Sequence, residues 1–117
     1  MKHEKDCLFC QMVSGQVPVV KVYEDDVLFC IRDIYPQAKI HLLVIPKEHC
    51  TSLIDCFGTD SLMENLFKVA TRIAQEQGLW PGGFRCVINS GRDAGQSVFH
   101  LHLHVMGGES LGTGFGA

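Results

Sequence analysis

Histidine and apolar residues alternate near the C-terminal end of the chain. From residue 98 to residue 105 the sequence reads Val-Phe-His-Leu-His-Leu-His-Val. Because successive side chains of a β-strand point to opposite faces, a strand over residues 98–106 would place three imidazoles on one face and the intervening apolar residues on the other. The histidines concerned are His100, His102 and His104. The pattern predicts a strand with one buried side and one side lined with imidazoles.

Four more strands and two helices follow from apolar periodicity and from the residues that interrupt it. We expect strands over residues 19–24, 27–33, 40–45 and 84–89. A short helix over residues 7–14 would end at Gly15. A longer helix over residues 60–77 carries an apolar stripe at helical spacing, made of Leu62, Leu66, Val69, Ala70 and Ile73. This order predicts an α+β domain, with an antiparallel sheet of about five strands and its helices on one side.

Length and composition narrow the class of protein. The 117 residues carry no internal repeat or linker, so we expect one domain over residues 1–117. A net charge of −3 argues against broad nucleic-acid binding, which requires neutralisation of many phosphates. No apolar run is long enough to span a membrane, and the polar start Met-Lys-His-Glu-Lys-Asp lacks the apolar core of a signal peptide. These features predict a globular protein of the cytoplasm.

The six cysteines are expected to be free thiols in such a reducing compartment. Cys30 and Cys86 lie in apolar, strand-like runs, where a thiol behaves as a small core side chain. The pair Cys7 and Cys10 is the possible exception, because Cys-x-x-Cys is a spacing that binds zinc. The alternative for this pair is two buried thiols of an apolar helix. Two more ligands would complete a tetrahedral site, and the candidates are His49 and His100.

Three kinds of chemistry are open to the histidine row. It could be a solvated strand face, although strict alternation of three histidines is unusual for one. It could bind a metal, but same-face neighbours on a strand lie roughly 7 Å apart, so at most two of the three could share one zinc. It could attack phosphorus, because a neutral imidazole is a competent nucleophile near neutral pH.

The loop before the row favours the third chemistry. Residues 91–97 read Gly-Arg-Asp-Ala-Gly-Gln-Ser, and the glycines allow backbone N–H groups to point at an anion. Ser97 adds a hydroxyl, and His104 adds an imidazole that can donate to phosphate oxygens. Alone the loop would be an ordinary surface turn. Beside the histidines it predicts an anion-binding site.

The pattern His-x-His-x-His followed by apolar residues resembles the histidine triad (HIT) superfamily of nucleotide hydrolases and transferases. Further stretches resemble its Hint branch, over about residues 7–108. They are Cys7-Leu-Phe-Cys10, Val22-Tyr-Glu-Asp-Asp26, Asp33-Ile-Tyr-Pro-Gln-Ala38, His41-Leu-Leu-Val-Ile-Pro46-Lys47, Val87-Ile-Asn89 and Gly107-Gly108. In combination these motifs are highly specific.

The resemblance implies a HIT-like fold whose antiparallel sheet extends across a homodimer, with a purine nucleoside monophosphate bound at the triad. It also implies that His102 attacks the α-phosphorus of a purine nucleoside phosphoramidate, such as adenosine 5'-phosphoramidate. An amine leaves, a nucleotidyl-histidine forms, and water releases the nucleoside monophosphate. The alternatives are a dinucleoside polyphosphate hydrolase with the same nucleophile and a non-catalytic, zinc-stabilised nucleotide-binding protein.

The resemblance assigns roles to individual residues. His41 and His100 would orient the nucleophile or relay protons to it, and Ser97 would assist catalysis at the phosphate. Contacts to the phosphate and leaving group are implied for Asn89, Gly95, Gln96, Ser97 and His104. Asp33 would bind the ribose hydroxyls, which suits a carboxylate that only accepts hydrogen bonds. The base pocket would be lined by Phe9, Ile31, Ile34 and Leu43. Without the resemblance, Asp33 is equally a turn residue and these apolar side chains are ordinary core.

The resemblance also bears on zinc and on the C-terminal tail. Some bacterial-type members use a zinc set that corresponds to Cys7, Cys10, His49 and His100. A structural zinc there would fix His100 and leave His102 free as the nucleophile. The tail over residues 112–117 lacks the tryptophan found near the end of many Hint proteins. Since that tail helps to shape the leaving-group side, the resemblance does not fix the amine specificity.

Overall fold

The structure is a computed structural model that describes residues 3–56 and 61–114. Within these residues it contains two α-helices, five strands and one short 3-10 helix. Their bounds are α1 Leu8–Ser14, β1 Lys21–Glu24, β2 Leu28–Arg32, β3 Ile40–Pro46, α2 Leu62–Glu76, β4 Phe84–Val87, η1 Arg92–Ala94 and β5 Leu103–Gly107. The strands form one sheet in the order β1-β2-β3-β5-β4, and all neighbouring pairs are antiparallel. The predicted α+β class and the sheet of five strands are confirmed.

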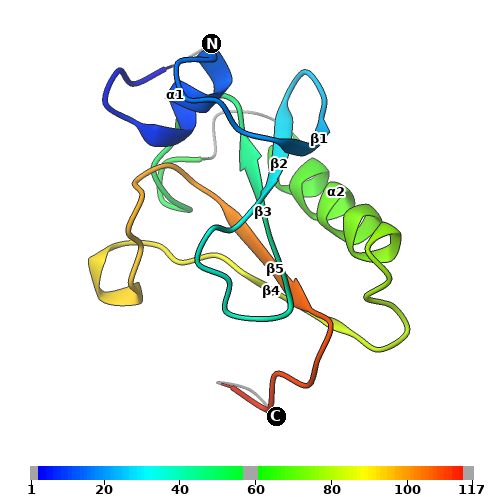
Figure 1. Cartoon of the computed structure of the whole chain (residues 1–117). Helices are drawn as coiled ribbons and strands as arrows, with labels where there is room; N and C mark the ends of the chain where they lie inside the picture. The colour runs from blue at the N-terminus through cyan, green and yellow to red at the C-terminus, as the bar shows by residue number, and fades with distance from the viewer. Residues whose placement is uncertain (1–2, 57–60, 115–117) are drawn as a thin grey trace.

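The two helices cover opposite faces of the sheet (Figure 1). Strand β2 packs Leu28 and Cys30 against the apolar stripe of α2, whereas Phe29 and Ile31 pack with Phe9 of α1. Strand β3 alternates in the same way. The prediction that both helices lie on one side is therefore wrong. The physical reason is that β2 and β3 are apolar on both faces, so each face requires a cover.

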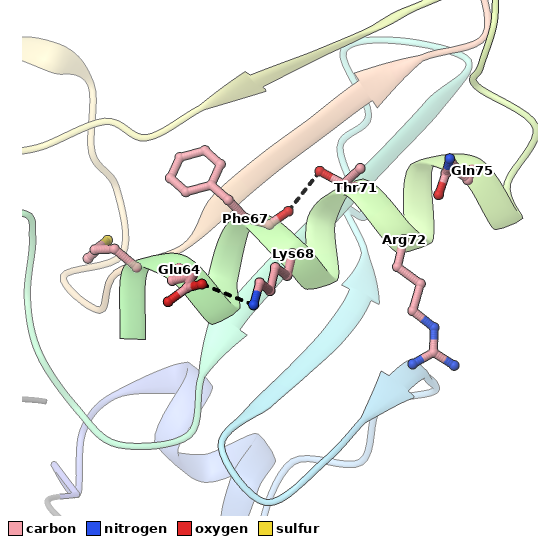
Figure 2. A pocket seen from close by; sticks show the side chains of 7 residues that line it. Glu64, Phe67, Lys68, Thr71, Arg72 and Gln75 are labelled. Atoms are coloured by element: carbon pink, nitrogen blue, oxygen red, sulfur yellow. Dashed lines mark hydrogen bonds and ion pairs between the residues drawn. The ribbon is translucent and has the colours of Figure 1, made fainter. Parts of the chain in front are cut away.

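Helix α2 supports the sheet on the side away from the histidines. It buries the predicted stripe, while Asp60, the first residue of the predicted helix, lies outside the described residues. Its outer surface carries a shallow groove in which Phe67 is 45% exposed and Lys68 pairs with Glu64 at 3.0 Å (Figure 2). None of the described helices is long and apolar enough to cross a membrane.

The last strand is shorter than the alternation predicts. β5 begins at Leu103, so only the third histidine of the row belongs to a strand. Upstream, the backbone bonds to loops rather than to a neighbouring strand, since the N–H of Leu101 donates to the carbonyl of Cys50 at 2.8 Å. The prediction of one continuous strand over residues 98–106 is wrong in its first half. The alternating pattern could not reveal that a loop replaces the strand partner there.

A disulfide joins Cys50 to Cys56, which contradicts the expectation of free thiols for this pair. The intervening turn is folded around Asp55, whose carboxylate accepts the backbone N–H groups of Thr51 and Ser52. These hydrogen bonds hold the pKa of Asp55 below its usual range. The turn brings the two cysteines together, with their Cα atoms 5.4 Å apart. The other four cysteines are free.

Candidate active site

Two cysteines and two histidines from distant parts of the chain converge in one cluster. Cys7 and Cys10 lie at the start of α1, His49 follows β3, and His100 precedes β5. Their ligand atoms all lie within 4.8 Å of one another. The Nδ1 atoms of the two histidines are 3.2 Å apart, and the sulfur–nitrogen distances are 3.2 Å for Cys7–His100, 3.5 Å for Cys10–His49 and 3.6 Å for Cys10–His100. The structure thus brings together the whole zinc set implied by the resemblance.

The spacing of this cluster fits a tetrahedral zinc ion. Zinc bonds of about 2.3 Å to sulfur and about 2.0 Å to nitrogen separate tetrahedral nitrogen pairs by about 3.3 Å and sulfur–nitrogen pairs by about 3.5 Å. The Nε2–H of His100 donates to the carbonyl of Pro46 at 2.7 Å, so its Nδ1 presents a lone pair to the cluster. Burial lowers the pKa of His100 to about 4 and raises the pKa of Cys10. The buried cluster therefore suits a cation that would stabilise thiolates.

A second cluster contains Asp33, His41 and His104. The Nε2 of His41 lies 2.8 Å from the Nδ1 of His104 and 3.4 Å from the Oδ2 of Asp33. On its other side, the Nδ1 of His41 accepts the backbone N–H of Gln37 at 2.9 Å. A neutral imidazole has only one N–H, so the proton of His41 must be on Nε2.

The hydrogen bonds of the second cluster form a chain, and this chain fixes which nitrogen of each imidazole carries the proton. The Nε2–H of His41 donates to the Nδ1 of His104, which places the remaining N–H of His104 on Nε2, where none of the described residues accepts it. Burial lowers the pKa of His41 and lowers the pKa of His104 to about 4, so both rings are neutral near pH 7. A metal ion at the His41 Nε2 would displace the proton that this chain needs. The arrangement thus holds a hydrogen-bond donor in place rather than a cation.

His102 lies between the two clusters and is 8% exposed. Its Nδ1–H donates to the backbone carbonyl of His100 at 2.8 Å, so its Nε2 carries an unprotonated lone pair. The ring of Phe9 meets it edge-on at 5.2 Å between centroids, and the ring of His104 lies 5.0 Å away. A free lone pair beside a free imidazole donor is the arrangement that attack on an anionic electrophile requires.

The predicted anion loop is built differently from the expectation. The side chain of Gln96 is buried, its oxygen accepts the Gly91 N–H at 2.8 Å, and its nitrogen donates to the Thr51 carbonyl at 2.6 Å. Gln96 therefore holds the loop together through its side chain, and its contact to the phosphate or leaving group stays a prediction. The Gly95 N–H is not available to an anion either, because it donates to the backbone carbonyl of Arg92. Gly95 itself has φ +83°, which favours glycine.

Residues 97–99 offer the remaining donors of this loop. In the part of the chain that the structure describes, the N–H groups of Ser97, Val98 and Phe99 donate no hydrogen bond. Ser97 is exposed, and Asn89 is half-buried two residues after the end of β4. The N–H groups that could bind an anion therefore belong to residues 97–99, and not to the glycines on which the prediction was based.

The apolar residues assigned to a base pocket separate into two groups. Phe9, Ile31 and Leu43 are buried in one cluster on the α1 face of the sheet. Ile34 is 82% exposed and does not belong to that cluster. The structure therefore brings three of the four together, and it places Ile34 on the surface next to Asp33.

Sequence reasoning missed the backbone groups that set the protonation of the histidines. They are the N–H of Gln37 and the carbonyls of Pro46 and His100. Every residue contributes such groups, so no residue-type pattern could have indicated them. Only the fold shows which ones face an imidazole.

Comparison with known proteins agrees with this fold and with the histidine pattern. The profile described as HIT domain matches residues 14–111. The chain belongs to the HIT domain family. An uncharacterized HIT-like protein from Chlamydia muridarum is 43% identical over 107 residues, which cover 91% of this chain and 84% of that protein.

Two solved structures show the same fold as this HIT protein. A HIT family hydrolase from Legionella pneumophila has a TM-score of 0.86 and 42% identity, covering 90% of this chain and 95% of its own. A zinc-bound histidine triad family protein from Mycobacterium smegmatis has a TM-score of 0.78 and 39% identity, covering 92% and 77% respectively. The predicted superfamily and its HIT-like fold are confirmed.

Proposed function

We propose that this HIT protein is a hydrolase of purine nucleoside phosphoramidates, of the Hint type, with His102 as its nucleophile. The observation that carries the proposal is the 2.8 Å contact between the Nδ1 of His102 and the His100 carbonyl, because an N–H on Nδ1 leaves the Nε2 of a neutral ring with a lone pair. The name of the Legionella relative supports hydrolysis in general. The substrate class rests on the resemblance to the Hint branch.

The first chemical step forms a bond between the Nε2 of His102 and the α-phosphorus while the phosphorus–nitrogen bond breaks. The nitrogen leaves as an amine and takes a proton from solvent. The Nε2–H of His104 donates to a phosphate oxygen, with Ser97 and the free N–H groups beside it as further donors. Water then attacks phosphorus, the bond to His102 breaks, and the nucleoside monophosphate is released.

His41 and His100 are proposed to act indirectly, by orienting the two histidines that contact the substrate. The Nδ1 of His41 accepts a backbone N–H, whose proton cannot be transferred onward, so His41 is suited to orient His104 rather than to relay protons. The backbone carbonyl of His100 likewise orients His102, because it accepts the Nδ1–H of that ring. Both are therefore proposed as positioning residues.

The nucleoside is proposed to lie across the α1 face of the sheet. The buried edge of Phe9, Ile31 and Leu43 offers an apolar wall to a purine. The carboxylate of Asp33 is only partly covered, and one of its oxygens accepts the Tyr35 N–H at 2.9 Å. The other oxygen lies 3.4 Å from the Nε2 of His41, whose N–H donates to His104, so this oxygen is the one proposed to accept from the ribose hydroxyls.

We also propose that zinc is bound by the cluster of Cys7, Cys10, His49 and His100. Zinc there would supply structure rather than chemistry, because it would fix His100, whose carbonyl holds the nucleophile. The name of the Mycobacterium smegmatis relative supports this metal. The tetrahedral spacing and the direction of the His100 lone pair support it independently.

The proposed assembly is a homodimer in which β4 strands pair side by side. β4 is an edge strand of the sheet, and an unpaired edge is a template for another strand. The exposed Phe67 on α2 would be covered by a neighbouring copy (Figure 2). The continuous sheet supports one domain over the whole chain, and the cytoplasm stays the predicted compartment. Light scattering coupled to size exclusion would test the dimer.

The test of the function compares wild type with His102→Asn on adenosine 5'-phosphoramidate and, in parallel, on diadenosine polyphosphates. We expect wild type to prefer the phosphoramidate, and the variant to lose about 10⁴-fold in kcat, as when a nucleophile is removed from other enzymes. Acid-quenched single turnover should trap a nucleotide on His102. Full activity of the variant would end the proposal, while a bound nucleotide with no covalent product would favour the non-catalytic alternative.

A further inference from the structure

The four side chains of the Cys7–Cys10–His49–His100 cluster differ in their access to solvent. Cys10, His49 and His100 are buried. Cys7 is half-buried, and it is the one member of the cluster that solvent reaches to this extent. The two sulfur atoms of the cluster are therefore not equivalent toward a reagent that arrives from outside.

A cavity of about 630 Å³ lies beside Cys7. Its walls include Cys7 and His49 but neither Cys10 nor His100. The other walls come from residues 4–6 and residues 97–99, most of which are exposed. The cavity is far larger than the about 30 Å³ that one water molecule occupies in the liquid, so a reagent as small as hydrogen peroxide fits inside it. Such a reagent approaches the cluster from the Cys7 side.

The two sulfur atoms can be joined by a small movement of the chain. All ligand atoms of the cluster lie within 4.8 Å of one another, and a disulfide requires a sulfur–sulfur distance of about 2.0 Å. Cys7 caps α1, and its sulfur accepts the Cys10 N–H at 3.5 Å. Residues 3–6, which precede it, are exposed and belong to neither apolar cluster of the protein. A movement of Cys7 toward Cys10 would therefore leave the core around those residues intact.

The remaining cysteines do not compete for the same reagent. Cys50 and Cys56 are already joined to each other. Cys30 and Cys86 pack in the apolar cluster under α2, where burial raises the pKa of Cys30 to about 12 and also raises the pKa of Cys86. Because the thiolate is the reactive form of cysteine, these two buried thiols react poorly, whereas a thiol that binds zinc is deprotonated.

We infer that Cys7 and Cys10 form an oxidation site, at which hydrogen peroxide joins them in a disulfide and thereby releases the zinc. The inference rests on the proposed zinc site. The Cys7 thiolate attacks one peroxide oxygen, the oxygen–oxygen bond breaks, and a sulfenic acid forms with release of hydroxide. The Cys10 thiolate then attacks the Cys7 sulfur, and a second hydroxide leaves. The two sulfurs lose two electrons to the peroxide, both hydroxides take protons from solvent, and only the two histidines remain as ligands.

The test treats the whole, zinc-loaded chain with hydrogen peroxide at pH 7 and measures free zinc with a chromogenic chelator. We expect release of about one zinc per chain, and a Cys7–Cys10 disulfide in a digest analysed by mass spectrometry without reduction. Dithiothreitol followed by zinc should restore the starting state, because disulfide formation is reversible. A short exposure in the presence of dimedone, which traps sulfenic acids, should label Cys7 about tenfold more than Cys86.

Cys7→Asp separates metal binding from oxidation. A carboxylate oxygen is also a zinc ligand and keeps the negative charge, but it cannot form a disulfide. This variant should therefore keep its zinc under the same peroxide treatment. Cys86→Ala is the matched control, since it removes a free thiol outside the cluster and should release zinc as wild type does. If Cys7→Asp binds no zinc, the disulfide mapped in wild type decides.

Retention of zinc by peroxide-treated wild type overturns the inference and leaves the zinc site intact. Equal zinc release from Cys7→Asp and wild type also overturns it, as does a dimedone label found mainly on Cys10, because the cavity would then not direct the reagent. If wild type holds no zinc before treatment, the zinc site and the inference fail together. None of these readouts uses a nucleotide, so a failure of the proposed hydrolase is distinguished from a failure of the oxidation site.

Discussion

The two histidine clusters contain similar side chains but are arranged for opposite purposes. In the Cys7–Cys10–His49–His100 cluster, the Pro46 carbonyl occupies the outer nitrogen of His100 and turns its lone pair inward. In the Asp33–His41–His104 cluster, the Gln37 N–H occupies one nitrogen of His41 and places a proton between the rings. The first cluster turns the lone pair of His100 toward the two cysteine sulfurs, whereas the second passes a hydrogen bond in one direction.

This difference shows that a set of potential ligands does not define a metal site by itself. Both clusters gather their ligand atoms within 4.8 Å. The backbone groups behind the rings decide which nitrogen is free, and hence whether a cation or a donor fits. The comparison can be tested by variants that remove one cluster while leaving the other complete.

The largest effect is expected from Cys10→Ser. Loss of a thiolate from a buried four-ligand site should abolish stoichiometric zinc and lower the free energy of unfolding by on the order of 3 kcal/mol. Elemental analysis after dialysis and urea denaturation measure the two quantities. His41→Ala is the matched control and should keep its zinc. Retention of zinc by Cys10→Ser, or its loss from His41→Ala, would contradict the division between the clusters.

The next effect concerns the donor chain. In His41→Ala nothing fixes the proton of His104, so kcat should fall by about 10- to 100-fold. Glutamine can place an amide N–H near the former Nε2, so His41→Gln should recover much of this loss. Steady-state kinetics on adenosine 5'-phosphoramidate give the comparison. Equal activity of the alanine and glutamine variants would show that His41 does not act through His104.

The disulfide beside the first cluster should affect stability more than chemistry. The double variant Cys50→Ser/Cys56→Ser should lower the free energy of unfolding by about 2 kcal/mol, because the unfolded chain gains freedom. Zinc content and kcat should stay close to wild type, since His49 keeps its ligand position. Loss of zinc in this variant would mean that the cluster depends on the disulfide turn.

The smallest effect is the pH dependence contributed by His104. Its pKa is about 4 in the folded chain because of burial, below the usual value for histidine, so the unfolded chain binds more protons between these values. Stability should therefore fall as pH drops from about 6.5 toward 4, by about 1 kcal/mol from this partly exposed group. Thermal unfolding of wild type and His104→Asn at pH 7 and 4.5 measures it. If the stability of both proteins changed equally between the two pH values, a group other than His104 would be responsible for the pH dependence.

Local sequence patterns were enough for most of the fold. Apolar periodicity predicted the long helix and the central strands, because burial imposes the same spacing wherever a face is covered. Two-sided strands were harder to predict. Leu28 to Ile31 and Leu42 to Ile45 are apolar at every position, and only the packed structure shows that α1 and α2 divide those faces between them.

The sequence by itself determined which chemical groups this HIT protein has: the alternating histidines, the Cys-x-x-Cys pair and the carboxylate before Pro36. Only the tertiary structure decided which of these groups lie together: His100 lies beside Cys7 and Cys10, and His41 lies beside His104. It also decided that Cys50 and Cys56 form a disulfide. The physical reason is that the protonation of each ring is set by backbone N–H and carbonyl groups. Every residue carries these groups, so the fold alone selects the ones that an imidazole meets.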